Sequence, residues 1–148
     1  MKENAPTRVL AIDYGRRRMG LALSDELRVT AQPLMTLVRT NRPKDIHRLR
    51  QLCRERGVAQ VVVGCPLAMS GEAGAMAEEV SRFAARLQKE LGIPVDLQDE
   101  RLTSWEAEQI AAEVKRKHSP LDDVAAAIVL REYLERRRGG PSTRAEKD

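Results

Sequence analysis

The chain has 148 residues, of which 42% are hydrophobic and 32% are charged. That length suits one ordinary domain, and this composition is typical of a folded globular protein rather than a disordered one. No apolar run approaches the length of a membrane span, and segment 1–6 has no apolar signal sequence, so we expect a cytoplasmic protein. Cys53 and Cys65 lack the spacing of a zinc or redox motif, and we expect two reduced thiols.

The net charge is +4, and the basic residues are clustered along the chain. Clustered arginines favour a polyanionic partner, although solvated helices and loops are also rich in arginine and lysine. Aromatic residues make up only 3% of the chain, so any nucleic acid would be held through its phosphates rather than by base stacking. The three basic groups are Arg16–Arg18, then Arg39, Arg42, Lys44, Arg48 and Arg50, and then Lys115–His118.

The first structured segment reads as a β-hairpin with a carboxylate at its tight end. Residues 9–12 form a continuous apolar run, typical of a strand buried on both faces, and the run stops at Asp13. Gly15 and three arginines follow, and residues 19–23 form a second apolar run. The pattern predicts an acid held at the end of a stiff strand, beside a basic, glycine-containing turn.

The next elements alternate between strands and helices. Residues 29–38 predict an edge-like third strand that tolerates Pro33. Pro43 opens a helix, and Gly57 ends it. Further along, the patterns predict a buried strand over 60–64, a loop over 65–74, a helix over 76–91 that Gly92 caps, and a strand over 94–98.

Two more helices are expected in the last third of the chain. Thr103 and Glu106 form a capping-box pattern that starts one helix at Ser104. Segment 119–122 starts the last helix in the same way, with an apolar face formed by Leu121, Val124, Ala125 and Ile128. We therefore expect one domain over 1–137 and a flexible tail over 138–148.

This order of elements predicts an α/β fold with a mixed five-stranded sheet. Three antiparallel strands come first, the later strands run parallel, and helices cover the faces of the sheet. In such a sheet Asp13 lies at the end of the first strand, and Glu100 lies just past the end of the last. If those two strands are neighbours, both acids share one edge. Asp122, at the start of the final helix, can then pack beside them.

Three converging carboxylates point to a divalent metal. Carboxylates in contact raise each other's pKa, and a hard cation such as Mg²⁺ removes that penalty. Two ions about 4 Å apart can activate a water molecule and stabilise the leaving oxygen of a phosphodiester. We expect Asp13 to bridge the ions, Glu100 to bind and to position the attacking water, and Asp122 to bind one ion. Carboxylates alone do not distinguish Mg²⁺ from Mn²⁺.

Each acid also has an ordinary structural explanation. Asp13 could simply begin a turn, because Asp-x-Gly is common turn chemistry. Glu100 could be a surface charge paired with Arg101. Asp122 could be only the capping acid of the last helix, and Asp123 competes with it.

The loop predicted after the fourth strand likewise has two interpretations. Residues 64–74 contain glycines and a proline that could only join strand to helix. Alternatively, their backbone amides could hold a phosphate at the start of the following helix. The segment is not a P-loop, because it lacks the Gly-Lys-Ser/Thr ending.

Four segments, in order, resemble the YqgF/RuvX family. The run Asp13–Asp25 is similar to its opening motif, and Val63–Leu67 with Gly71 resembles its glycine-proline loop. Asp99–Ser104 matches its Asp-Glu-Arg-Leu-Thr segment, and Asp122–Leu130 resembles its last motif, in which an acid precedes a small-residue helix. Together the four motifs make the resemblance specific over nearly the whole folded part of the chain.

The resemblance implies a ribonuclease H-like fold and a metal-dependent nuclease that matures the precursor of 16S ribosomal RNA. By matching positions, it assigns the catalytic and metal-binding roles to Asp13, Glu100 and Asp122, and it favours Asp122 over Asp123. Cys65 and Ala68 depart from the family pattern, which affects loop contacts with RNA but not the acids. We expect nucleic-acid contacts from Arg16, Arg17, Arg18, Arg101, Gly64, Pro66 and Thr103.

Other functions compete with an RNA nuclease. A kinase or actin-like ATPase opens with a similar strand–turn–strand unit, but it needs two lobes, and 148 residues supply only one. A Holliday junction resolvase acting on branched DNA would use the same metal site, with specificity from dimer geometry. A non-catalytic RNA-binding module would gain nothing from carboxylates that repel phosphate. The sequence leaves both a monomer and a homodimer open.

Overall fold

The computed structural model describes residues 5–65, 71–99 and 122–139. The described elements follow the predicted order of strands and helices. The strands are β1 (Arg8–Asp13), β2 (Arg18–Ser24), β3 (Ala31–Val38), β4 (Val58–Cys65) and β5 (Val95–Asp99), and the helices are α1 (Arg42–Arg56), α2 (Gly71–Leu91) and α4 (Asp122–Gly139).

The five strands form one mixed sheet in the order β3-β2-β1-β4-β5. Strands β1, β2 and β3 pair antiparallel, whereas β4 runs parallel to both β1 and β5, which confirms the predicted sheet. The first and last strands are not neighbours, because β4 lies between them. Val61, Val62 and Val63 are all fully buried, so β4 needs cover on both faces and takes a central position.

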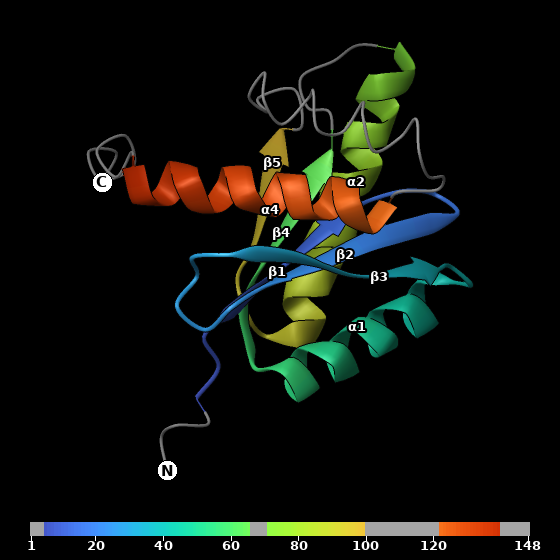
Figure 1. Cartoon of the computed structure of the whole chain (residues 1–148). Helices are drawn as coiled ribbons and strands as arrows, with labels where there is room; N and C mark the ends of the chain where they lie inside the picture. The colour runs from blue at the N-terminus through green and yellow to red at the C-terminus, as the bar shows by residue number, and fades with distance from the viewer. Residues whose placement is uncertain (1–4, 66–70, 100–121, 140–148) are drawn as a thin grey trace.

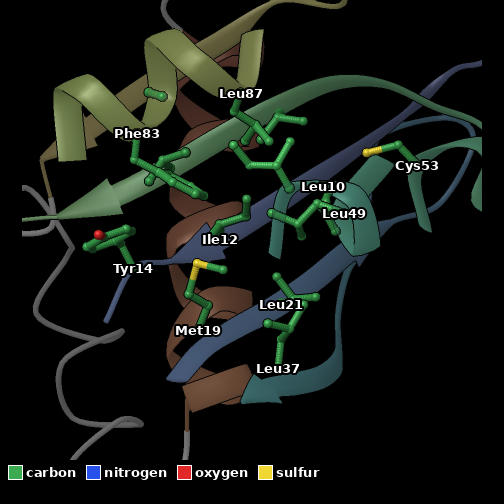
Figure 2. Close-up of a cluster of buried hydrophobic side chains, with 14 of the residues drawn as sticks. Leu10, Ile12, Tyr14, Met19, Leu21, Leu37, Leu49, Cys53, Phe83 and Leu87 are labelled. Carbon is green, nitrogen blue, oxygen red and sulfur yellow. The ribbon is translucent and has the colours of Figure 1, made fainter. Parts of the chain in front are cut away.

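Helices cover both faces of the sheet, as predicted. Helices α1 and α2 pack on one face and α4 on the other (Figure 1). Alternate residues of β1 point to opposite sides, so Leu10 and Ile12 contact the first two helices while Val9 and Ala11 face α4. Figure 2 shows the larger cluster, in which Phe83 of α2 lies over the strands.

Helix α4 meets the sheet through small residues. Ala126 is fully buried against a sheet face that includes Ala11 and Ala22, so the helix backbone can approach closely. The predicted apolar face of this helix is shifted: the buried residues are Ala126, Val129, Leu130, Tyr133 and Leu134. Residues 124–130 are all apolar, so the periodicity of the sequence does not select one face.

The ends of several elements differ by a few residues from the predicted ones. Asn41 caps α1 by accepting from the Lys44 amide at 2.9 Å, and Gly57 ends the helix with φ of 67°, as predicted. Helix α2 begins at Gly71, inside the predicted loop, and α4 continues to Gly139, past the predicted end of the domain. The capping-box helix expected from Ser104 lies outside the described residues.

The structure bears on two further expectations, which concern membrane-spanning segments and the state of the cysteines. Within the described ranges, no helix is both long and apolar enough to cross a membrane. Cys53 is a free, buried cysteine, and burial raises the pKa of its thiol to about 12. This thiol therefore stays protonated and unreactive at neutral pH. The side chain of Cys65 lies outside the part of the chain that the structure describes.

We expect Ala126→Leu to lower the free energy of unfolding by about 1–3 kcal/mol, because extra methylenes overfill the interface between α4 and the sheet. Ala125→Leu is the matched control, since Ala125 is only half-buried and should change stability by about 0.5 kcal/mol or less. Urea denaturation followed by circular dichroism measures both. Equal losses in the two variants would contradict the close approach of α4.

Candidate functional site

Asp13 is the last residue of β1, and it is held by pairing on both sides. It pairs with Gly20 of β2 and with Gly64 of β4. Because Val9 and Ala11 face α4, the alternation of the strand directs Asp13 to that same face. The carboxylate thus projects from a rigid strand end, with a glycine as its neighbour on each adjoining strand.

Strands β1, β4 and β5 end level with one another. Gly64 pairs with Asp13 on one side and with Gln98 of β5 on the other. Gln98 is buried, and its Nε2 donates to the Val129 carbonyl of α4 at 3.2 Å, which fixes the end of β5 against the helix. Glu100 follows two residues later in the sequence and lies outside the described residues.

The start of α4 lies over the edge of the sheet that carries Asp13. The other end of α4 is located by Arg138, whose Nη1 is 3.4 Å from the carbonyl oxygen of Arg28. Arg28 in turn donates to the Thr7 carbonyl at 2.7 Å, just before β1 begins. The helix therefore runs antiparallel to β1, and its first residue, Asp122, lies toward the end of β1 (Figure 1).

The structure thus places Asp13 at this edge and directs the start of α4 toward it. The side chain of Asp122 and the whole of Glu100 lie outside the described residues. Among the side chains that are described, no group of three or more His, Cys, Asp or Glu could hold a metal ion. The convergence of all three carboxylates therefore stays a prediction.

The arginine turn, which we define as residues 14–18, directly follows Asp13. A Cβ atom on Gly15 would lie 2.4 Å from the carbonyl oxygen of Arg18, so only glycine fits this turn. Tyr14 points inward, and its ring centroid lies 5.0 Å from that of Phe83 (Figure 2). The turn is therefore constrained by its own backbone and by an aromatic side chain in the core.

Glu79 of α2 fastens the arginine turn from one side. The Tyr14 hydroxyl donates to Glu79 Oε2 at 2.6 Å, and Arg16 Nε donates to Oε1 at 3.0 Å. Burial, followed by the hydrogen bond to Glu79, raises the pKa of Tyr14, so the hydroxyl keeps its proton. The hydrogen bonds from Tyr14 and then Arg16 hold the pKa of Glu79 below its usual value. Arg16 is thus already paired within the fold.

Arg39 fastens the same turn from the other side. Its Nη1 donates to the Gly15 carbonyl at 3.0 Å, and its guanidinium carbon lies 4.9 Å from the centroid of the Tyr14 ring. Its Nε donates at 3.0 Å to Asp45, whose side chain is fully buried. The sequence groups Arg39 with residues that favour a polyanion, and the structure corrects this. Arg39 turns inward because the buried carboxylate requires an opposite charge.

The predicted nucleic-acid contacts fall into three classes. Arg16, Arg17 and Arg18 are all exposed near Asp13, and Arg16 pairs with Glu79. Gly64 is buried in the level row of strand ends. The remaining three predicted contacts lie outside the described residues: Pro66, Arg101 and Thr103.

Sequence reasoning missed the groups that hold the arginine turn. For Asp45 a signal existed, because it shares the buried face of α1 with Ile46 and Leu49, and a carboxylate on such a face needs a partner. For Glu79 no comparable signal existed, because its partner Tyr14 lies 65 residues earlier in the chain.

We expect Arg39→Gln to lower the free energy of unfolding by about 3–5 kcal/mol, because it leaves Asp45 buried without an opposite charge. Adding Asp45→Asn should restore part of the loss, so the double variant should be more stable than the sum of the two single changes implies. Urea denaturation of the four proteins gives this coupling. A loss below about 1 kcal/mol in Arg39→Gln would contradict the role of Arg39 as the partner of a buried charge.

Comparison with known proteins identifies the family. A family model described as "RuvX: Holliday junction resolvase" matches residues 7–136. A protein of Koribacter versatilis named "Putative pre-16S rRNA nuclease" is 42% identical over 134 residues, with 88% of each chain covered. A protein of the same name from Chloroflexus aurantiacus is 44% identical over 138 residues, with 90% of each chain covered.

Solved structures confirm the expected ribonuclease H-like fold. RuvC of T. thermophilus in complex with a Holliday junction substrate matches with a TM-score of 0.61 at 20% identity, covering 90% of this chain and 96% of that chain. The fowlpox virus Holliday junction resolvase matches with a TM-score of 0.53 at 15% identity, covering 86% of this chain and 98% of that chain. From the family model and the two relatives, the chain belongs to the RuvX family.

Proposed function

We propose that the protein is a metal-dependent nuclease that cleaves the precursor of 16S ribosomal RNA in the cytoplasm. The main support for the proposal is the position of Asp13 where β1, β4 and β5 end in register, on the face of the sheet that α4 covers. Two more acids belong to the adjoining segments, because Asp122 opens α4 and Glu100 directly follows β5. The names of the two relatives supply the RNA substrate.

The donor set fits a hard divalent cation. Asp13, Glu100 and Asp122 offer only carboxylate oxygens, which Mg²⁺ and Mn²⁺ prefer. When bound, a pair of such ions would supply Lewis acidity for the attacking water and for the leaving oxygen of the phosphodiester. In the proposal, Asp13, Glu100 and Asp122 would hold the ions, and Glu100 would also position the attacking water.

The arginine turn has the position and charge to hold the scissile strand. Arg17 and Arg18 are exposed next to Asp13, where they offset the negative field of the acids. We propose that these two guanidinium groups bind phosphates on either side of the bond that is cut. Arg39 and Glu79 serve this role indirectly, since they fix the turn that carries both arginines.

A second candidate function is cleavage of branched DNA. Two observations favour it: the description of the family model, and the fold shared with RuvC bound to a Holliday junction. The two functions differ in assembly, because a two-fold symmetric junction needs two active sites and hence a homodimer, whereas a single RNA strand needs only a monomer.

The test is a cleavage assay on a precursor 16S RNA fragment and, in parallel, on a four-way DNA junction, each with Mg²⁺ or Mn²⁺. We expect RNA cleavage that falls by at least about 100-fold in Asp13→Asn, Glu100→Gln and Asp122→Asn, since even residues that only support metal ligands contribute about 10–100-fold.

Asp123→Asn is the matched control, because it removes an equal charge one residue further along α4, and it should cut normally. Cleavage of the junction alone would replace the RNA substrate with branched DNA. Equal loss in Asp122→Asn and Asp123→Asn would contradict the assignment of Asp122. Metal-dependent cleavage that survives Asp13→Asn would overturn the proposed site.

A further inference from the structure

Helix α1 carries an unusual excess of positive charge on its exposed side. Its one exposed acid is Glu55, because Asp45 is buried and paired with Arg39. By contrast, the exposed charges of α2 are mixed, and α4 gathers three of its arginines in its last turn, where they offset the negative end of the helix. The exposed basic residues of α1 are Lys44, Arg48, Arg50, Arg54 and Arg56, and we call them the α1 basic face.

The fold makes little use of these charges. Arg48 Nη1 donates to the Val38 carbonyl at 3.1 Å, which is a neutral acceptor and leaves the positive charge uncompensated. Among the described residues, Lys44, Arg50 and Arg54 form no ion pair. The positions of Arg50 and Arg54 are one helical turn apart, so these like charges slightly destabilise the isolated helix. Arg54 and Arg56, in the last turn of α1, offset the negative end of the helix, but Lys44, Arg48 and Arg50 lie outside that turn and do not.

The α1 basic face begins beside the arginine turn. The backbone amide of Arg39, just before α1, donates to the Arg17 carbonyl at 2.9 Å. From there α1 runs for 15 residues, a length of roughly 22 Å at 1.5 Å per residue. It lies on the face of the sheet opposite to α4, and thus away from the acids (Figure 1). A nucleic acid that contacts it must extend from the site past the arginine turn.

We propose that the α1 basic face is a second RNA-binding surface, which holds the phosphates of a double-stranded segment flanking the cleavage site. The face has guanidinium and ammonium groups, and α1 has no Phe, Tyr or Trp side chain, so it suits a backbone whose bases are already paired. Binding there is independent of sequence and raises affinity without touching the chemical step. This inference rests on the proposed RNA nuclease function.

The test compares two triple variants that remove the same charge. One carries Lys44→Gln, Arg50→Gln and Arg54→Gln on α1. The control carries Arg82→Gln, Arg86→Gln and Lys89→Gln on α2, all exposed positions. Fluorescence anisotropy in the Asp13→Asn background measures affinity for an RNA with a double-stranded flank and for a short single-stranded RNA, over a range of salt concentrations. Steady-state cleavage by the same triples is measured with Asp13 intact.

We expect the α1 triple to bind the flanked RNA about 10-fold more weakly at about 0.1 M salt. Its slope of log affinity against log salt should fall by about 2–3, as expected for three lost phosphate contacts. The short RNA should bind normally, and cleavage should show a raised KM with an unchanged kcat. The α2 triple should differ from the parent by less than about 2-fold on both RNAs.

Equal weakening by the α1 and α2 triples would overturn the proposal, because net charge alone would then explain binding. Unchanged affinity of the α1 triple for the flanked RNA would also overturn it, and would leave an acidic protein surface as the partner for this face. Failure of the parent protein to cut any RNA would instead count against the proposed function, so the two failures are distinguishable.

Discussion

Strand β1 is the constraint on which the rest of the structure depends. It is paired on both sides and covered on both faces, and Val9, Leu10, Ala11 and Ile12 are all fully buried. Such a strand is held in register, because a slip by one residue would exchange Leu10 and Ile12, which pack under α1 and α2, with the smaller side chains that pack under α4. Asp13 is therefore fixed in position at the end of β1, on the face that α4 covers, and the candidate site is built around it.

The second layer of organisation is electrostatic. The arginine turn, unlike the strand that ends at Asp13, needs support from side chains. Two acids from different helices, Glu79 and Asp45, supply that support by engaging the turn through Tyr14, Arg16 and Arg39. As a consequence, the arginines near Asp13 have different roles. Arg39 and Arg16 fix the turn through ion pairs with Asp45 and Glu79, and Arg17 and Arg18 are the two exposed arginines that we propose bind phosphate.

The sequence predicted the strands, the sheet and the location of Asp13 well, because these depend on short apolar runs and on glycine and proline signals. It did not predict that β4 separates β1 from β5. Both β1 and β4 are short apolar runs, and such runs do not reveal which strands are neighbours. It grouped Arg39 with the residues that favour a polyanion, whereas Arg39 pairs with the buried Asp45. Local charge clustering does not reveal a buried acid on a neighbouring helix. It also chose the wrong face of α4, where apolar residues follow one another without a period. The assignment of Glu100 and Asp122 to the site depends on the sequence motifs and on the direction of β5 and α4.

If Asp13 belongs to a divalent-metal site, the protein should bind Mn²⁺ through it in the absence of substrate and turnover. Isothermal titration of Mn²⁺ into the protein, with electron paramagnetic resonance of the free ion as a second readout, would compare the parent with Asp13→Asn and Asp123→Asn. We expect Asp123→Asn to bind Mn²⁺ like the parent and Asp13→Asn to bind it at least about 10-fold more weakly. Equal Mn²⁺ affinity of the parent and Asp13→Asn would show that Asp13 is not a metal ligand.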